Sequence, residues 1–65
     1  MLSDNIRNYR KENNLSQDEL AEKLGVSRQS ISLWENGLRE PTLSNLIAIS
    51  KYFKVSIDYL VGLED

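Results

Sequence analysis

Three segments of the chain share a pattern that marks the start of a helix. Each has an apolar residue, then a serine, then another apolar residue four positions after the serine. A serine in this position accepts a hydrogen bond from a free backbone N–H group, and the two apolar residues pack together across the first turn. The three segments are Leu15-Ser16…Leu20, Val26-Ser27…Ile31 and Val55-Ser56…Leu60. Three such starts in a chain of 65 residues limit it to a fold of short helices.

Two further helices complete the pattern. Thr42 follows Pro41 as a cap, and the first segment of the chain carries Leu2, Ile6 and Tyr9 on one helical face. Glycine and asparagine accept the left-handed conformation that ends a helix, so Gly25 and the pair Asn36-Gly37 predict stops. No segment alternates with a period of two, so no strand is expected. We therefore predict one all-α domain over residues 1–65, a compact fold of five helices at about 3–13, 17–24, 28–35, 43–53 and 57–62.

The composition excludes several kinds of chemistry. The chain has no cysteine and no histidine, so a disulfide framework, a thiolate or imidazole metal site and a histidine-based nucleophile are absent. No glycine-rich phosphate loop and no close pair of carboxylates stands out, so we expect no enzyme, no cofactor and no metal. Apolar runs are far shorter than the roughly 18 residues that span a bilayer, and no signal pattern opens the chain. We expect a cytoplasmic protein that does not enter a membrane and has no separate effector-binding domain.

The third predicted helix has two chemically different faces. At about 100° per residue, Ser30, Ile31 and Trp34 share one side. The other side spans about 140° and carries Arg28, Gln29, Ser32 and Leu33. The first side is suited to packing and the second is presented to solvent.

The presented face has side chains that match the edges of bases in a DNA major groove. Arg28 can donate a fork of hydrogen bonds to guanine, Gln29 can pair with adenine, and Ser32 can donate or accept. Leu33, an exposed leucine among polar neighbours, can pack against a thymine methyl group. The alternative is an ordinary solvated helix face with one exposed apolar residue, because most polar helix faces have no such role. The location of this helix after a glycine hinge favours DNA recognition.

From about Ile6 to Val61, the chain resembles the phage-repressor and Cro-like helix-turn-helix proteins, also called the XRE family. A lone helix-turn-helix pattern is weak evidence, but this chain matches the family over its whole register. The matching residues are Arg10, Ser16-Gln17-x-x-Leu20-Ala21, Gly25-Val26-Ser27, Ile31-x-x-Trp34-Glu35-Asn36-Gly37, Pro41 and Ile49. The resemblance implies a lambda-repressor-like domain whose helix-turn-helix consists of the second and third helices.

The resemblance also implies roles for individual residues. Arg28, Gln29 and Leu33 match base-reading positions, with Ser32 beside them. Positions that contact the DNA backbone are Gln17, Ser27 and Asn36, with Arg39 as the local cation in the following loop. Helix N-termini favour anions, which supports such a role for Gln17 and Ser27. Ser27 as a simple cap and Gln17 as a solvated side chain are the alternatives, and for Ser27 we expect both roles together.

Other positions are implied to be structural. Arg10 and Glu35 match a largely buried ion pair that joins the first helix to the end of the third, and the planar guanidinium suits a bidentate carboxylate partner. Lys54 stands where glycine is common in the family, so a left-handed conformation there costs about 1 kcal/mol.

The charge balance indicates a weak DNA binder. Eight basic and ten acidic residues give a net charge of −2, whereas nucleic-acid binders are often basic. The main candidates for phosphate attraction are Arg7, Lys11, Arg28 and Arg39, which are too few for strong binding by one subunit. We therefore expect a homodimer on duplex DNA with recognition helices about 34 Å apart. Apolar residues in and just after the last helix predict the dimer surface, which consists of Ile57, Tyr59, Val61 and Leu63.

Three functional classes remain from the sequence, of which a small enzyme is disfavoured for the reasons given above. The leading hypothesis is a sequence-specific regulator that represses transcription by binding a near-palindromic operator. The alternative is a protein-interaction module, such as an antitoxin-like partner, in which Leu33, Leu38 and Tyr59 anchor another protein. A regulatory protein partner is compatible with both. Binding to duplex DNA that weakens steeply with salt separates them, because only the first requires it.

Overall fold

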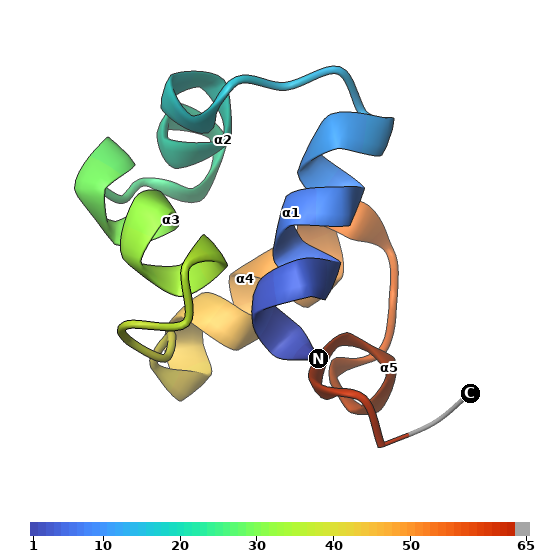
Figure 1. Ribbon diagram of the computed structural model, residues 1–65. Coiled ribbons are helices and arrows are strands. Elements are labelled where there is room, and N and C mark those ends of the chain that lie inside the picture. The colour runs from blue at the N-terminus through green and yellow to red at the C-terminus, as the bar shows by residue number, and fades with distance from the viewer. Residues whose placement is uncertain (64–65) are drawn as a thin grey trace.

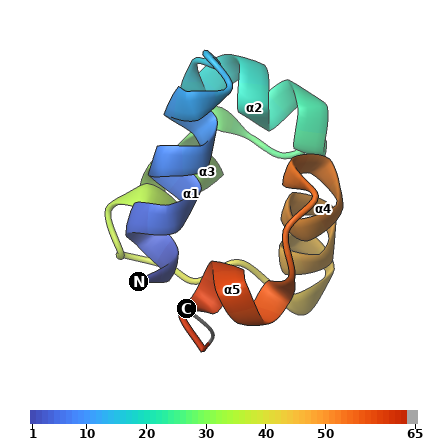
Figure 2. The same ribbon diagram turned by 90° about the vertical axis from the view of Figure 1, so that its right-hand side faces the viewer.

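Five helices form the fold of the computed structural model, which describes residues 1–63. They are α1 (Leu2–Glu12), α2 (Gln17–Leu24), α3 (Arg28–Glu35), α4 (Leu43–Phe53) and α5 (Ile57–Val61). No strand occurs within residues 1–63, and the predicted all-α fold is confirmed. Helix α3 packs against both α1 and α2, whereas α5 packs against α1 and α4. Helices α2 and α5 lie at opposite ends of the molecule (Figures 1 and 2).

Side-chain caps begin four of the helices, as the sequence predicts. Ser16 Oγ accepts a hydrogen bond from the N–H group of Glu19 at 3.0 Å, and Glu19 Oε1 accepts one from the N–H group of Ser16 at 2.9 Å. Ser27, Thr42 and Ser56 accept equivalent bonds at 3.1, 3.2 and 3.0 Å. These bonds satisfy N–H groups that a helix leaves without partners.

Three helix ends differ from the prediction by one residue each. Helix α1 runs from residue 2 to residue 12 instead of 3 to 13, because Asn13 caps it and Asn14 turns left-handed with φ of 57°. Helix α5 ends at Val61 because Gly62 is left-handed, with φ of 89°. Lys54 has φ of 59° after α4, as the sequence analysis anticipated.

Each helix supplies at least one side chain to a common core. Ile6 of α1, Ile49 of α4 and Leu60 of α5 are completely buried. Helices α2 and α3, which form the candidate site, supply two each: Leu20, Ala21, Ile31 and Trp34. The position of α3 is therefore fixed by all the other helices through a shared core.

Candidate nucleic-acid interface

A glycine turn sets the angle between α2 and α3. Gly25 has φ of 72°, and the N–H group of Val26 donates to the carbonyl of Ala21 at 3.0 Å. A Cβ atom added at Gly25 would have no neighbour within 4 Å. Glycine is therefore favoured here by its backbone conformation and not by lack of space. Small Ala21, 4% exposed, allows the two helices to pack closely.

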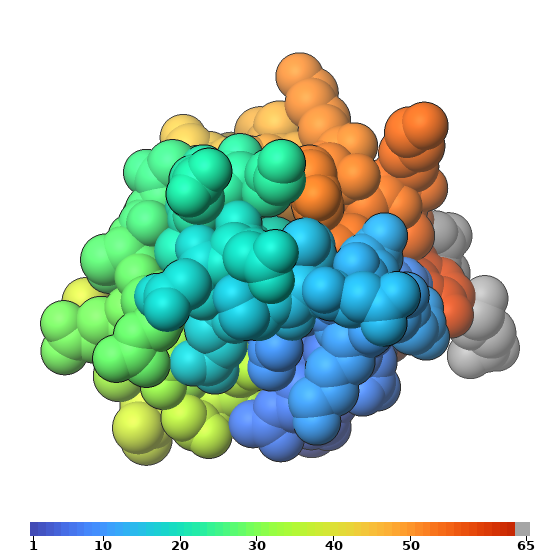
Figure 3. Space-filling view, turned by 90° about the horizontal axis from the view of Figure 1, so that it is seen from above, coloured from blue at the N-terminus to red at the C-terminus, as the bar shows by residue number. Residues whose placement is uncertain are grey.

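Helix α3 is buried on one side and presented on the other. Ile31 is completely buried and Trp34 is 4% exposed. Arg28 and Gln29 are exposed on the outer side, and Ser32 lies beside them half-buried. In the space-filling view, α3 lies along the edge of the molecule next to α2 (Figure 3).

Leu33 is less exposed than the sequence analysis predicted. The structure makes it half-buried, and its carbonyl accepts a hydrogen bond from the N–H group of Leu38 at 2.9 Å. The loop after α3 folds back at this point, since Arg39 also donates its N–H group to the same carbonyl, at 3.4 Å. Leu38 is the strongly exposed apolar residue of this region, at 75%.

Arg28 has a neighbour that the sequence analysis did not identify. Its Nε atom lies 3.4 Å from Asp18 Oδ1 at the start of α2, with the two side chains 61% and 79% exposed. An ion pair this exposed is screened by water and contributes at most about 1 kcal/mol. Arg28 is thus loosely held and can leave Asp18 for another partner.

Arg10 and Glu35 form the ion pair that the family resemblance implies. Arg10 donates to both carboxylate oxygens, from Nε at 2.6 Å and from Nη2 at 2.9 Å. The side chains are only 12% and 1% exposed. Arg10 also donates from Nη1 to the carbonyl of Leu15 at 2.9 Å, so one guanidinium joins α1, the following loop and α3.

Burial and hydrogen bonding act in opposite directions on Glu35. Burial alone would raise its pKa, but the hydrogen bonds from Arg10 and Gln17 and the nearby positive charges outweigh it, leaving the pKa below its ordinary value. The hydrogen bond to Glu35 likewise raises the pKa of Arg10. The pair is therefore charged at neutral pH.

Gln17 lies at the start of α2, as predicted, but its side chain has a partner that the sequence did not reveal. Its Nε2 atom donates to Glu35 Oε1 at 3.2 Å and the residue is half-buried. The side chain points to the buried carboxylate and not into solvent, because this carboxylate accepts more hydrogen bonds than Arg10 supplies. At the start of α2, the backbone N–H groups remain the candidates for an anion.

Arg7 connects α1 to the C-terminal end of α3. Its Nη2 atom donates to the carbonyl of Glu35 at 2.9 Å and to Asn36 Oδ1 at 3.3 Å. Asn36 in turn donates from Nδ2 to Ser32 Oγ at 3.3 Å. From the sequence, Arg7 was predicted only as one of the cations that attract phosphates. Its spacing of three residues from Arg10 on one helix is the signal that could have placed both side chains on the same target.

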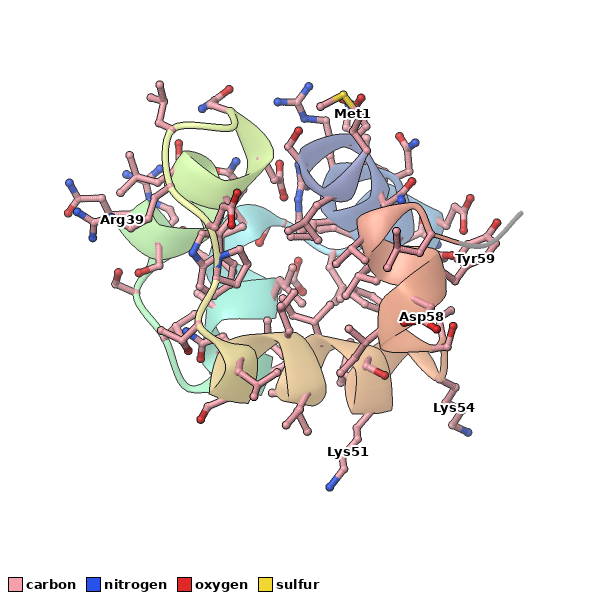
Figure 4. The ribbon with its side chains drawn as sticks, turned by 90° about the horizontal axis from the view of Figure 1, so that it is seen from below. Met1, Arg39, Lys51, Lys54, Asp58 and Tyr59 are labelled. Atoms are coloured by element: carbon pink, nitrogen blue, oxygen red, sulfur yellow. The ribbon has the colours of Figure 1, made fainter. Side chains whose placement is uncertain are left out.

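The loop after α3 supplies a separate cation. Arg39 is exposed and projects from the molecule on the side of α3, whereas Tyr59 of α5 lies on the opposite side (Figure 4). Ser27, at the other end of α3, is occupied as a cap. The positions predicted to contact the DNA backbone thus include two exposed residues, Asn36 and Arg39, at the loop end of α3.

The predicted dimer residues are exposed to different degrees. Leu63 is 77% exposed and Tyr59 is 41% exposed. Ile57 and Val61 are half-buried. The exposed part of this surface is therefore mainly Tyr59 and Leu63.

Two kinds of site are not found in residues 1–63. No group of acidic residues there is arranged to hold a metal ion. None of the helices in this part of the chain combines the length and apolar character needed to cross a membrane.

Comparison with known proteins identifies the class. The family model HTH_3, described as helix-turn-helix, matches residues 6–60. The chain belongs to this family, as predicted from its motifs.

Individual relatives agree with this family. The uncharacterized HTH-type transcriptional regulator YqaE of Bacillus subtilis is 43% identical over 61 residues, which cover 94% of this chain and 53% of YqaE. The HTH-type transcriptional activator BcrR of Enterococcus faecalis is also 43% identical, over 98% of this chain and 31% of BcrR. The chain thus spans about half of one relative and a third of the other. Both relatives are named as transcription regulators, in agreement with the prediction that this protein is not an enzyme.

A solved structure shows the same fold bound to DNA. The P22 c2 repressor, crystallised with a synthetic operator, superposes with a TM-score of 0.91 at 38% identity. The match covers 98% of this chain and 97% of that one. The arrangement of five helices described above is therefore one that holds a DNA operator in a related protein.

Proposed function

We propose that this protein is a sequence-specific transcription regulator that binds duplex DNA through α3 and represses by occluding a promoter in the cytoplasm. Residues 1–65 act as one DNA-binding unit in this proposal. The observation that carries it is the division of α3, which buries Ile31 and Trp34 while it presents Arg28 and Gln29 to solvent. A helix held in this way can enter a major groove with its polar face toward the bases.

The outer residues of α3 are assigned to base readout. Arg28 releases Asp18 and donates two hydrogen bonds to a guanine, and Gln29 pairs with an adenine. Ser32 and Leu33 contact adjacent positions through a hydroxyl group and a methyl group. Leu33, being half-buried, offers a smaller contact to a thymine than a fully exposed leucine.

Groups around α3 are assigned to the phosphates. The N-termini of α2 and α3, at Gln17 and Ser27, offer backbone N–H groups and a favourable dipole to an anion. Asn36 and Arg39 approach the phosphates from the loop end of α3. These contacts fix the register of the helix on DNA but carry no sequence information themselves.

The low positive charge argues for two copies of the chain on one operator. The net charge is −2, and the longest dimension of the molecule is 28 Å. A two-fold dimer doubles the phosphate contacts and presents two copies of α3 to half-sites about 34 Å apart on a near-palindromic site. We assign the dimer contact to α5 and the residues just after it, through Tyr59 and Leu63 with Ile57 and Val61 at the border of the contact.

A selection of bound sequences from random duplex DNA tests DNA recognition. We expect an enriched motif with two symmetry-related halves, and affinity for it that falls steeply as salt rises. Binding with no enriched motif, or with no dependence on salt, would contradict the proposal and favour a protein-interaction module.

Dimerisation has its own test with a matched control. Leu63→Glu places a charge on the proposed contact, whereas Leu43→Glu places one on α4, where the leucine is 68% exposed. Sedimentation with and without operator DNA should show that only Leu63→Glu prevents the dimer. A wild-type protein that stays monomeric on DNA at high concentration would contradict the assignment.

A further inference from the structure

Arg7 is attached to the end of α3 at three points. Its Nη2 atom contacts the carbonyl of Glu35 at 2.9 Å and Asn36 Oδ1 at 3.3 Å. Its Nε atom lies 3.6 Å from Glu35 Oε1, and the side chain is 38% exposed. Arg7 is therefore fixed against α3 although much of it faces water.

The chemistry of the guanidinium sets the direction of the hydrogen bonds that follow. A guanidinium has only donors, so the Asn36 atom facing Arg7 has to be the amide oxygen. The amide nitrogen then faces Ser32, whose Oγ atom lies 3.3 Å away. Because that nitrogen only donates, Ser32 Oγ is the acceptor in this pair.

Two donor hydrogens are left on the outer side of α3 by this chain of bonds. Ser32 keeps its hydroxyl hydrogen, which no acceptor within residues 1–63 takes. Asn36 is exposed and keeps the second hydrogen of its amide group. Asn36 is the cap residue after α3, and its hydrogen bond to Ser32 Oγ places the two side chains side by side at this end of the helix.

We propose that Arg7 is a positioning residue that orients Asn36 and thereby makes Ser32 a hydrogen-bond donor toward the bases. Ser32 then favours a base that offers a major-groove acceptor, such as guanine or thymine. Cytosine offers only a donor there, which can reach the second lone pair of Ser32 but leaves its hydroxyl hydrogen without an acceptor. The second Asn36 hydrogen is directed to a phosphate. This inference rests on the proposed function and adds a selective group to it.

Comparing Arg7→Met with Lys11→Met separates positioning from charge. Both variants remove one positive charge from α1, but Lys11 is exposed and its side chain makes no hydrogen bond or ion pair within residues 1–63. On the selected operator, we expect Arg7→Met to weaken binding about three- to tenfold more than Lys11→Met, as expected for losing one oriented hydrogen bond. Equal losses for the two variants would overturn the proposal.

The base preference provides a readout that a structural role would not change. At one operator position, Ser32→Ala should abolish the preference against cytosine. Arg7→Met should abolish the same preference, whereas Lys11→Met should keep it. A uniform loss of affinity on all sequences in Arg7→Met would overturn the proposal, because it would reflect general destabilisation.

Asn36→Asp tests the same point if Arg7→Met does not fold. An aspartate keeps an acceptor for Arg7 but lacks the donor for Ser32, so the Ser32 hydroxyl turns to donate to the carboxylate. The preference at that operator position should disappear. Since the preference is a ratio of affinities, the added negative charge cancels from it, and a preference that persists would overturn the proposal.

The free protein provides a test that does not depend on DNA. In nitrogen-15 NMR spectra, the side-chain amide signals of Asn36 should move in Arg7→Met and stay in place in Lys11→Met. Signals that do not move in Arg7→Met would overturn the positioning role even where DNA binding is intact. Signals that move in a protein that binds no duplex DNA would instead overturn the proposed function and, with it, the selective role of Ser32.

Discussion

The two ends of α3 have different environments. At the C-terminal end, Trp34 and Glu35 are 4% and 3% exposed, and Glu35 receives hydrogen bonds from α1 and α2. At the N-terminal end, Arg28 and Gln29 are exposed, and the contact between Arg28 and Asp18 is loose. The C-terminal end of α3 is thus held by the buried pair of Arg10 and Glu35, which we call the clamp, and the N-terminal end is presented to solvent. Substitutions at the clamp should change stability, and substitutions at the presented end should change recognition.

The largest expected effect is on the clamp. Glu35→Ala leaves Arg10 buried without its carboxylate, and we expect the free energy of unfolding to fall by about 3 to 5 kcal/mol. Chemical denaturation followed by circular dichroism measures it. The control is Glu40→Ala, which truncates an exposed glutamate and should change stability by less than about 0.5 kcal/mol. Similar losses of stability in both variants would show that the Arg10–Glu35 pair does not hold the fold together.

A second prediction concerns the presented end. Gln29→Ala should weaken operator binding by about 1 to 3 kcal/mol, the value of one bidentate base contact. The melting temperature should hardly change, because the side chain is exposed. Asn8→Ala truncates an exposed amide on α1 and serves as the control, with both properties unchanged. A large fall in the melting temperature of Gln29→Ala would break the division between the two ends.

Lowering the pH should weaken the Arg10–Glu35 pair and leave the presented end of α3 unchanged. The folded state holds the pKa of Glu35 below its ordinary value of 4.5. The stabilisation from the ionised Glu35 carboxylate is complete above pH 4.5 and is lost as pH falls toward the lower pKa of the folded state. Each pH unit between the unfolded and folded pKa corresponds to about 1.4 kcal/mol of stability. The stability gap between wild type and Glu35→Gln should therefore narrow as pH falls below 4.5. A stability difference that is constant with pH would mean that ionisation of Glu35 contributes nothing to the stability of the fold.

The smallest expected effect is that of Asp18→Asn. The ion pair with Arg28 is exposed, so the free energy of unfolding should change by less than about 1 kcal/mol. Operator affinity should rise by up to about fivefold, since Arg28 is released and a negative charge near the DNA is removed. Competition assays with fluorescent operator measure it. A fall in affinity would show that Asp18 braces Arg28 in the complex and does not compete for it.

The sequence was sufficient where the interactions are local. The caps at Ser16, Ser27, Thr42 and Ser56 join residues three positions apart, so residue type and spacing predict them. The two faces of α3 likewise follow from the period of a helix. These features determined the fold and the location of the candidate site.

Contacts between distant segments were harder to predict. Arg10 and Glu35 are 25 residues apart, and their pairing was implied by the family resemblance and not by spacing. Gln17 was expected to point outward and instead contacts Glu35, because the demand of a buried carboxylate for donors appears only when the helices are packed. The bonds of Arg7, and the contact between Asp18 and Arg28, depend in the same way on side chains that meet across helices.

The shared core has a consequence for how long the molecule survives. Each helix supplies only one or two of the core side chains. A helix that detaches therefore exposes the core side chains of the remaining helices to water, and we expect the five helices to unfold cooperatively. A ligand held at α3 alone then lowers the open population of the entire chain, by mass action. Proteases act on the unfolded form. Protein bound to its operator would therefore be degraded more slowly than unbound protein.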